Sequence, residues 1–223
     1  MIVLRNLFTQ LAALLFLSGI LGGLSFATPL LPADAPTEIG SNASEAVKHT
    51  IIDLMQVLDD ESLKQPEQAG ARRQKIEEII KQRVDYEEMA KRALGTPWPT
   101  LSVSEQQEFV DLFVQLLRDA FAGRLTDRSD EQVTFLGELR EDNFAEVKAH
   151  MSGRKVDTPI SFRLIHRANE WWVYDVVIDG ASIVSNYRSQ FTRIIRDVSY
   201  AGLVNKMKQK AIAVKIFERA PIP

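Results

Sequence analysis

The chain has 223 residues, of which 45% are hydrophobic and 26% charged, and its formal net charge is −3. This balance is typical of a globular protein, and the negative charge argues against nucleic acid as its main partner. The absence of cysteine excludes disulfides, thiol catalysis, cysteine-bound metal and a lipidated cysteine anchor.

The amino terminus has the three parts of a secretory signal peptide. Arg5 is the only charged residue among the first 33, an apolar run covers residues 11–24, and Ser25-Phe26-Ala27 offers small residues for cleavage. An uncleaved anchor is the alternative, but the run is short for a membrane span of about 20 residues. The predicted organisation is a signal peptide over 1–27, a flexible leader over 28–43, one α+β domain over 44–215 and a tail over 216–223.

Helices come first in the predicted domain, then strands, then helices again. Apolar residues at helical spacing predict helices over residues 44–58, 72–84, 85–94 and 102–125. Four strand-like segments follow at 132–139, 144–151, 159–168 and 171–178, before helical spacing returns over 183–195 and 201–214. This order predicts an α+β fold, a curved antiparallel sheet of about four strands wrapped by helices.

The fourth predicted strand is unusually rich in large apolar residues. Alternation along a strand predicts one apolar face made of Trp172, Tyr174, Val176 and Ile178. The opposite face contains two carboxylates, Asp175 and Asp179, which indicates a partly wet surface or a helix cap. In the preceding strand Ile160, Phe162 and Leu164 share a face. So much apolar surface around one sheet can be solid, or it can enclose an apolar cavity.

No motif for catalysis, a cofactor or a metal is present. The three histidines, His49, His150 and His166, have no metal-binding spacing, and neither a Gly-x-Ser-x-Gly elbow nor a phosphate loop occurs. We therefore predict no catalytic residue and no cofactor. One alternative is an enzyme on a cone-shaped α+β fold, with Asp175 or His166 as a base in an apolar pocket. Another is an interaction or chaperone-like protein with a solid core.

Several segments together resemble a known family in order and spacing. They are residues 84–95, Trp98 and residues 104–113, 172–176, 179–184, 187–191 and 202–204. The family is MlaC, also called the toluene-tolerance family of periplasmic phospholipid-binding proteins, and the resemblance covers nearly all of the predicted domain. The chain departs from it at Ser199-Tyr200, where the family leads us to expect a glycine before the last helix.

The resemblance implies a soluble periplasmic carrier without enzymatic activity, with lipid tails in an apolar pocket between sheet and helices. Such a carrier passes phospholipid between an outer-membrane complex and an inner-membrane ABC transporter with an MCE domain, which maintains outer-membrane lipid asymmetry. A hopanoid-type lipid is an alternative ligand. Arg188 is the candidate for a headgroup or partner contact at the pocket mouth, although a solvated helix face is the favoured interpretation of this residue. The predicted lipid contacts are Phe109, Phe113, Leu116, Leu117, Phe162, Leu164, Trp172, Tyr174, Val176, Ile178, Tyr187 and Phe191.

Overall fold

The computed structural model describes residues 42–121, 132–152 and 157–210, which all belong to one compact unit, Ile39–Pro223. The predicted signal peptide, nearly all of the predicted leader and the predicted tail lie outside the described residues. Within the part that is described, no helix is both long and apolar enough to cross a membrane.

In the described part of the chain four α-helices precede the sheet, as predicted: α1 (Ala43–Asp59), α2 (Ala69–Lys81), α3 (Tyr86–Leu94) and α4 (Val103–Phe121). Side chains at their first turns fix where they start. The Asn42 side chain accepts a hydrogen bond from the Ser44 amide, and the Asp85 carboxylate accepts one from the Glu88 amide. Gly95, at φ +72°, ends α3 in a conformation that favours glycine.

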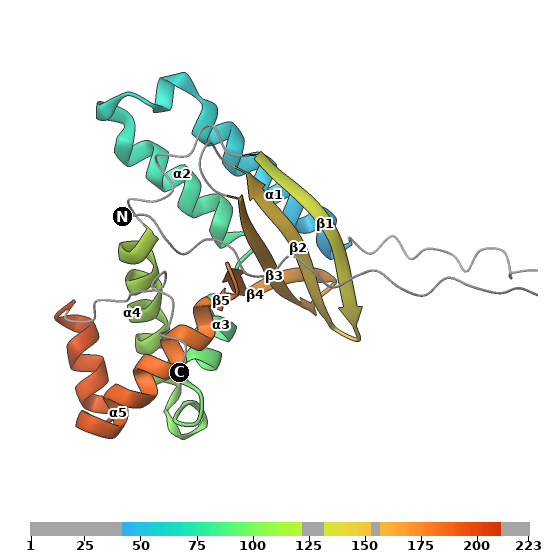
Figure 1. Ribbon diagram of the computed structural model, residues 1–223. Coiled ribbons are helices and arrows are strands. Elements are labelled where there is room, and N and C mark those ends of the chain that lie inside the picture. Colours follow the sequence, from blue (N-terminus) through green and yellow to red (C-terminus); the bar gives the residue numbers. More distant parts are fainter. Residues whose placement is uncertain (1–41, 122–131, 153–156, 211–223) are drawn as a thin grey trace, which may run out of the picture. The chain divides into compact units, whose positions relative to one another are not determined.

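The sheet is antiparallel and its strands follow one another in chain order (Figure 1). Its strands are β1 (Gln132–Glu141), β2 (Phe144–Ser152), β3 (Asp157–Arg167), β4 (Glu170–Ile178) and the two-residue β5 (Ala181–Ser182). The helix α5 (Ile183–Lys208) follows and contains one non-helical residue, Ser199. The predicted α+β order is confirmed, and the very short β5 is the strand that the prediction lacked.

A β-bulge interrupts the alternation of β4. Leu164 lies opposite Val173 and Arg163 lies opposite Asp175, so two adjacent residues of β3 face positions two apart on β4. Tyr174 is the extra residue, and the alternation of inward and outward side chains changes phase there.

Because of this bulge, the prediction of one shared apolar face on β4 is wrong. Val176 lies opposite Phe162, which is on the same face as Leu164 and Val173. Ile178 is on the same face as Val176, whereas Trp172 and Tyr174 point to the opposite face. We call the face that carries Val173 and Val176 the inner face of the sheet. Small residues near the start of α1 pack on it, against Val147, Leu164, Trp171 and Val173.

Candidate functional site

An open groove of about 880 Å³ lies between the second half of α1 and the beginning of β1. Ile51, Ile52 and Met55 of α1 line one side, and Val133 and Phe135 of β1 line the other. The remaining lining residues are polar or charged: Lys48, Gln56, Asp59, Asp60, Gln132 and Thr134. This volume is within the range of small-molecule binding sites, and the apolar middle suits a hydrocarbon ligand.

The groove opens because α1 covers the sheet tightly only near its own start. Ala43, Ala46 and Val47 are buried against the inner face. One turn later the side chains are larger but less covered: Ile51 and Met55 are half-buried, and Ile52 is 52% exposed. Apolar side chains are normally covered in a close-packed interior, so this end of α1 leaves space for something else.

On the inner face of the sheet, burial of apolar side chains also decreases from the start of α1 toward the groove. Ala145 and Val147 are buried beneath the start of α1, whereas Val133, Phe135 and Phe162 are only half-buried. Partly covered apolar side chains of α1 and of β1 therefore meet in the groove, whereas the exposed Leu136, Leu139 and Phe144 of the sheet do not line it.

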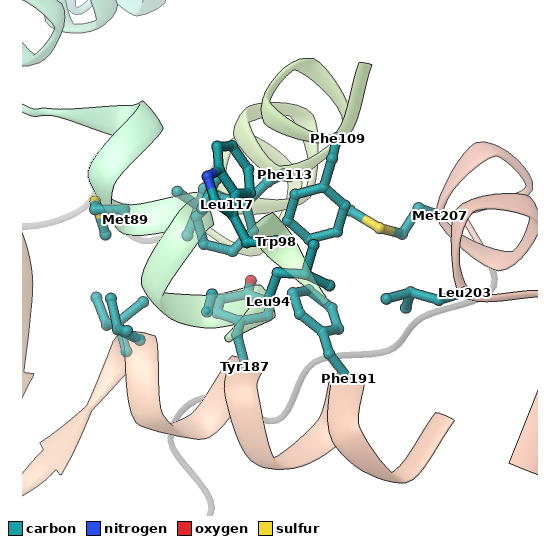
Figure 2. Packing of buried hydrophobic residues seen from close by; sticks show 14 residues of the cluster. Met89, Leu94, Trp98, Phe109, Phe113, Leu117, Tyr187, Phe191, Leu203 and Met207 are labelled. Carbon is teal, nitrogen blue, oxygen red and sulfur yellow. The ribbon is translucent and has the colours of Figure 1, made fainter. Parts of the chain in front are cut away.

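Five of the predicted lipid contacts lie instead in a packed cluster of helix side chains, which we call the helical cluster. Its central rings are in close contact: the Phe113 and Tyr187 centroids are 5.1 Å apart, and those of Phe109 and Phe191 are 5.7 Å apart (Figure 2). Leu117 is also buried there, and Leu116 packs against the cluster. No groove-lining residue comes from α4 or α5. The packing gives these residues a structural role, and their contact with a lipid stays a prediction.

The six predicted contacts from the sheet divide between its two faces. Leu164 is buried on the inner face, and Phe162, Val176 and Ile178 are half-buried there. Trp172 and Tyr174 lie on the opposite face, where the Tyr174 ring meets the Phe144 ring at 6.1 Å and the Arg92 guanidinium at 4.0 Å.

Arg188 holds two helices together and does not line the groove. Its Nε donates a hydrogen bond of 2.7 Å to the carbonyl oxygen of Arg92, near the carboxyl end of α3. Its side chain also lies against Gly95, the residue that ends α3. The structure thus places Arg188 at the junction of α3 and α5, and a headgroup or partner contact there stays a prediction.

The proposed enzymatic bases also lie outside the groove. Asp175 is buried and accepts hydrogen bonds from the Ser182 hydroxyl, the Val184 amide and the Arg163 guanidinium, at 2.6, 3.1 and 3.2 Å. It therefore acts as a cap for α5, one of the two roles expected from the sequence. His166 packs its ring 4.9 Å from that of Trp171. Among the described residues, no group of three or more acidic or histidine side chains could hold a metal.

The groove residues of α1 were not identified as a site from the sequence. The available signal was the width of the apolar sector: Ile51, Leu54 and Met55 form an apolar stripe at helical spacing, and Ile52 extends it to the solvent side. An exposed large apolar residue beside such a stripe is compatible with a ligand surface.

Comparisons with known proteins agree with this architecture. A family model described as MlaC protein matches residues 48–209. The intermembrane phospholipid transport system binding protein MlaC of Haemophilus influenzae is 25% identical over 142 residues, which are 61% of this chain and 66% of that protein. A phospholipid-binding protein from Ralstonia solanacearum, solved in complex with a phospholipid, shares the fold with a TM-score of 0.68. It is 23% identical, and the match covers 76% of this chain and 97% of the other. The chain belongs to the MlaC family.

Proposed function

We propose that this chain is a phospholipid carrier that holds acyl chains in the groove between α1 and β1 and on the adjoining inner face. The observation that carries the proposal is the groove of about 880 Å³, with half-buried apolar side chains on both walls. Each methylene removed from water contributes about 0.8 kcal/mol, so an acyl chain leaves a membrane only for a comparably apolar site.

The relatives support the same ligand class. The Haemophilus influenzae protein is named for intermembrane phospholipid transport, and the Ralstonia solanacearum protein was solved with a phospholipid. Aliphatic and aromatic walls make non-directional contacts. We therefore expect the groove to discriminate weakly between tails, and a hopanoid-type lipid is an outcome for the test to distinguish.

We propose a transport route that the family and the sequence support. The predicted signal peptide directs the chain to the periplasm, where it would move lipid between an outer-membrane complex and an inner-membrane ABC transporter with an MCE domain. The sequence contains no phosphate loop for nucleotide hydrolysis. The direction of transport, and hence outer-membrane lipid asymmetry, would depend on those partners.

Lipid extraction tests the proposal. The chain from Thr28 onward is purified after periplasmic expression, extracted with organic solvent and analysed by mass spectrometry, with an unrelated periplasmic protein as the background. Ile51→Trp fills the groove, and Val103→Trp adds the same bulk at a position that is 83% exposed and outside it. We expect phospholipid near one equivalent in the wild type and in Val103→Trp, and a loss in Ile51→Trp. A folded wild type without lipid, or undiminished lipid in Ile51→Trp, would contradict the proposal.

A further inference from the structure

The two ends of the groove carry opposite charges, on either side of its apolar middle. Among the described residues that line the groove, Lys48 is the only cation, whereas two acids, Asp59 and Asp60, lie at the other end. Lys48 and Asp59 are eleven residues apart on α1, which corresponds to about 16 Å along the helix axis. An anionic group is therefore favoured at the Lys48 end and repelled at the other.

The Lys48 side chain is placed to reach a bound ligand. Its Nζ lies 5.7 Å from the centroid of the Phe135 ring, which belongs to the opposite wall of the groove. It forms an ion pair with Glu45, at 2.9 Å, and both side chains are more than a third exposed. Exposed pairs one helical turn apart contribute little free energy. A phosphate bound in the groove could therefore replace Glu45 as the partner of the Lys48 ammonium.

We infer that Lys48 binds the phosphate of the lipid headgroup, which fixes the orientation of the lipid in the groove. The inference rests on the proposed function and adds a specificity residue to it. The headgroup lies at the Lys48 end, and the tails pass between Ile51 and Met55 on one side and Phe135 on the other. An ammonium is a compact charge with three donors, so it favours a phosphate without selecting what is attached to it.

A competition between two lipids with identical tails tests this assignment. Delipidated full-length mature protein is incubated with dioleoyl phosphatidylglycerol vesicles that contain a minor fraction of dioleoylglycerol, and bound lipids are quantified by mass spectrometry. The wild type should retain the phosphate-bearing lipid preferentially. Lys48→Gln should reduce that preference about fivefold, the effect of losing one partly exposed charge-assisted contact.

Two further variants control for the loss of a surface charge. Lys64 forms an equivalent pair with Glu61, at 2.7 Å and three residues apart, but does not line the groove, so Lys64→Gln should leave the preference unchanged. Glu45→Gln removes the acid that competes for Lys48 and should raise the preference. Equal preference in the wild type, Lys48→Gln and Glu45→Gln would overturn the assignment.

A parallel exchange in inorganic phosphate, at matched ionic strength, separates the two possible sources of the anion. A phosphate attached to tails in the groove keeps its advantage over dioleoylglycerol, which supports the assignment. If inorganic phosphate at a concentration equal to that of the lipid removes the advantage in the wild type, Lys48 binds the free ion in preference to the tethered headgroup, and the lipid assignment is wrong. A wild type that retains neither lipid overturns the proposed function together with this inference, whereas equal retention of both lipids overturns the inference only.

Discussion

The helical cluster and the inner face of the sheet carry the same kinds of side chain but pack them to different extents. In the helical cluster Phe109 and Phe113 are buried, with ring centroids 6.3 Å apart. On the inner face Phe135 and Phe162 remain half-buried beside the groove. Closely packed side chains stabilise the fold, whereas apolar surface that no protein side chain covers is available to a ligand. We therefore expect mutations in the first region to affect stability, and mutations in the second to affect lipid content.

The largest effect should come from Phe113→Ala, which leaves a cavity among buried rings. We expect it to lower the free energy of unfolding by about 4 kcal/mol. Phe135→Ala removes a half-buried ring and should cost only about 1 kcal/mol, while reducing bound phospholipid. Urea denaturation of delipidated protein measures both, because bound lipid would otherwise add to the apparent stability. Similar losses from the two substitutions would show that the regions do not differ as described.

A buried carboxylate connects the helices to the sheet and should give the next largest effect. Glu88 accepts hydrogen bonds from Arg167 at 2.9 Å and from Arg92 at 2.8 Å, which joins α3 to the end of β3. Although burial disfavours its charge, these two partners hold the pKa of Glu88 below its ordinary value of 4.5. Glu88 is buried, but the Arg92 and Arg167 side chains are 31% and 47% exposed, so water screens part of the interaction. Glu88→Gln should therefore lower the free energy of unfolding by about 2 kcal/mol at pH 7.

The pH dependence of this loss distinguishes the charge from the shape of the side chain. A carboxylate with a lowered folded-state pKa stabilises above its unfolded pKa, and the contribution disappears as pH falls through the folded value. The difference between the wild type and Glu88→Gln should therefore shrink as pH falls below about 4.5. Glu87→Gln, on the exposed side of the same helix, should change stability by less than about 0.5 kcal/mol at any pH. A difference that stays constant with pH would assign the effect to packing.

The sequence predicted the elements well because helical and strand periodicities are local properties. It also indicated the cap of α5, since a carboxylate on an otherwise apolar strand needs a partner. The faces of β4 could not be predicted, because the bulge at Tyr174 is defined by the register with β3. Whether the predicted contacts meet a lipid could not be decided from the sequence, for a related reason. Aromatic residues at helical spacing predict burial, but the spacing does not say whether protein or ligand covers them.

The smallest effect concerns the departure from the family at Ser199. This residue interrupts α5 at φ 71° and ψ 172°, a region that is almost restricted to glycine. The turn is also tight, since a Cβ on Gly202 would lie 2.7 Å from a Val198 methyl group. The end of α5 is nevertheless held in place: Leu203 and Met207 are buried in the helical cluster, and the packing there imposes the conformation on serine.

Ser199→Gly should therefore stabilise the protein by about 1 kcal/mol, the relief of backbone strain less the greater flexibility of glycine in the unfolded chain. Ser199→Ala is the matched control, because it removes the hydroxyl but keeps the strained Cβ and should give no gain. Thermal and urea denaturation of the delipidated proteins measure both variants. A gain in both would attribute the effect to the hydroxyl. A loss in Ser199→Gly would mean that the weak 3.4 Å hydrogen bond from the Gly202 amide to the Ser199 hydroxyl outweighs the strain, and that serine at this position stabilises the junction.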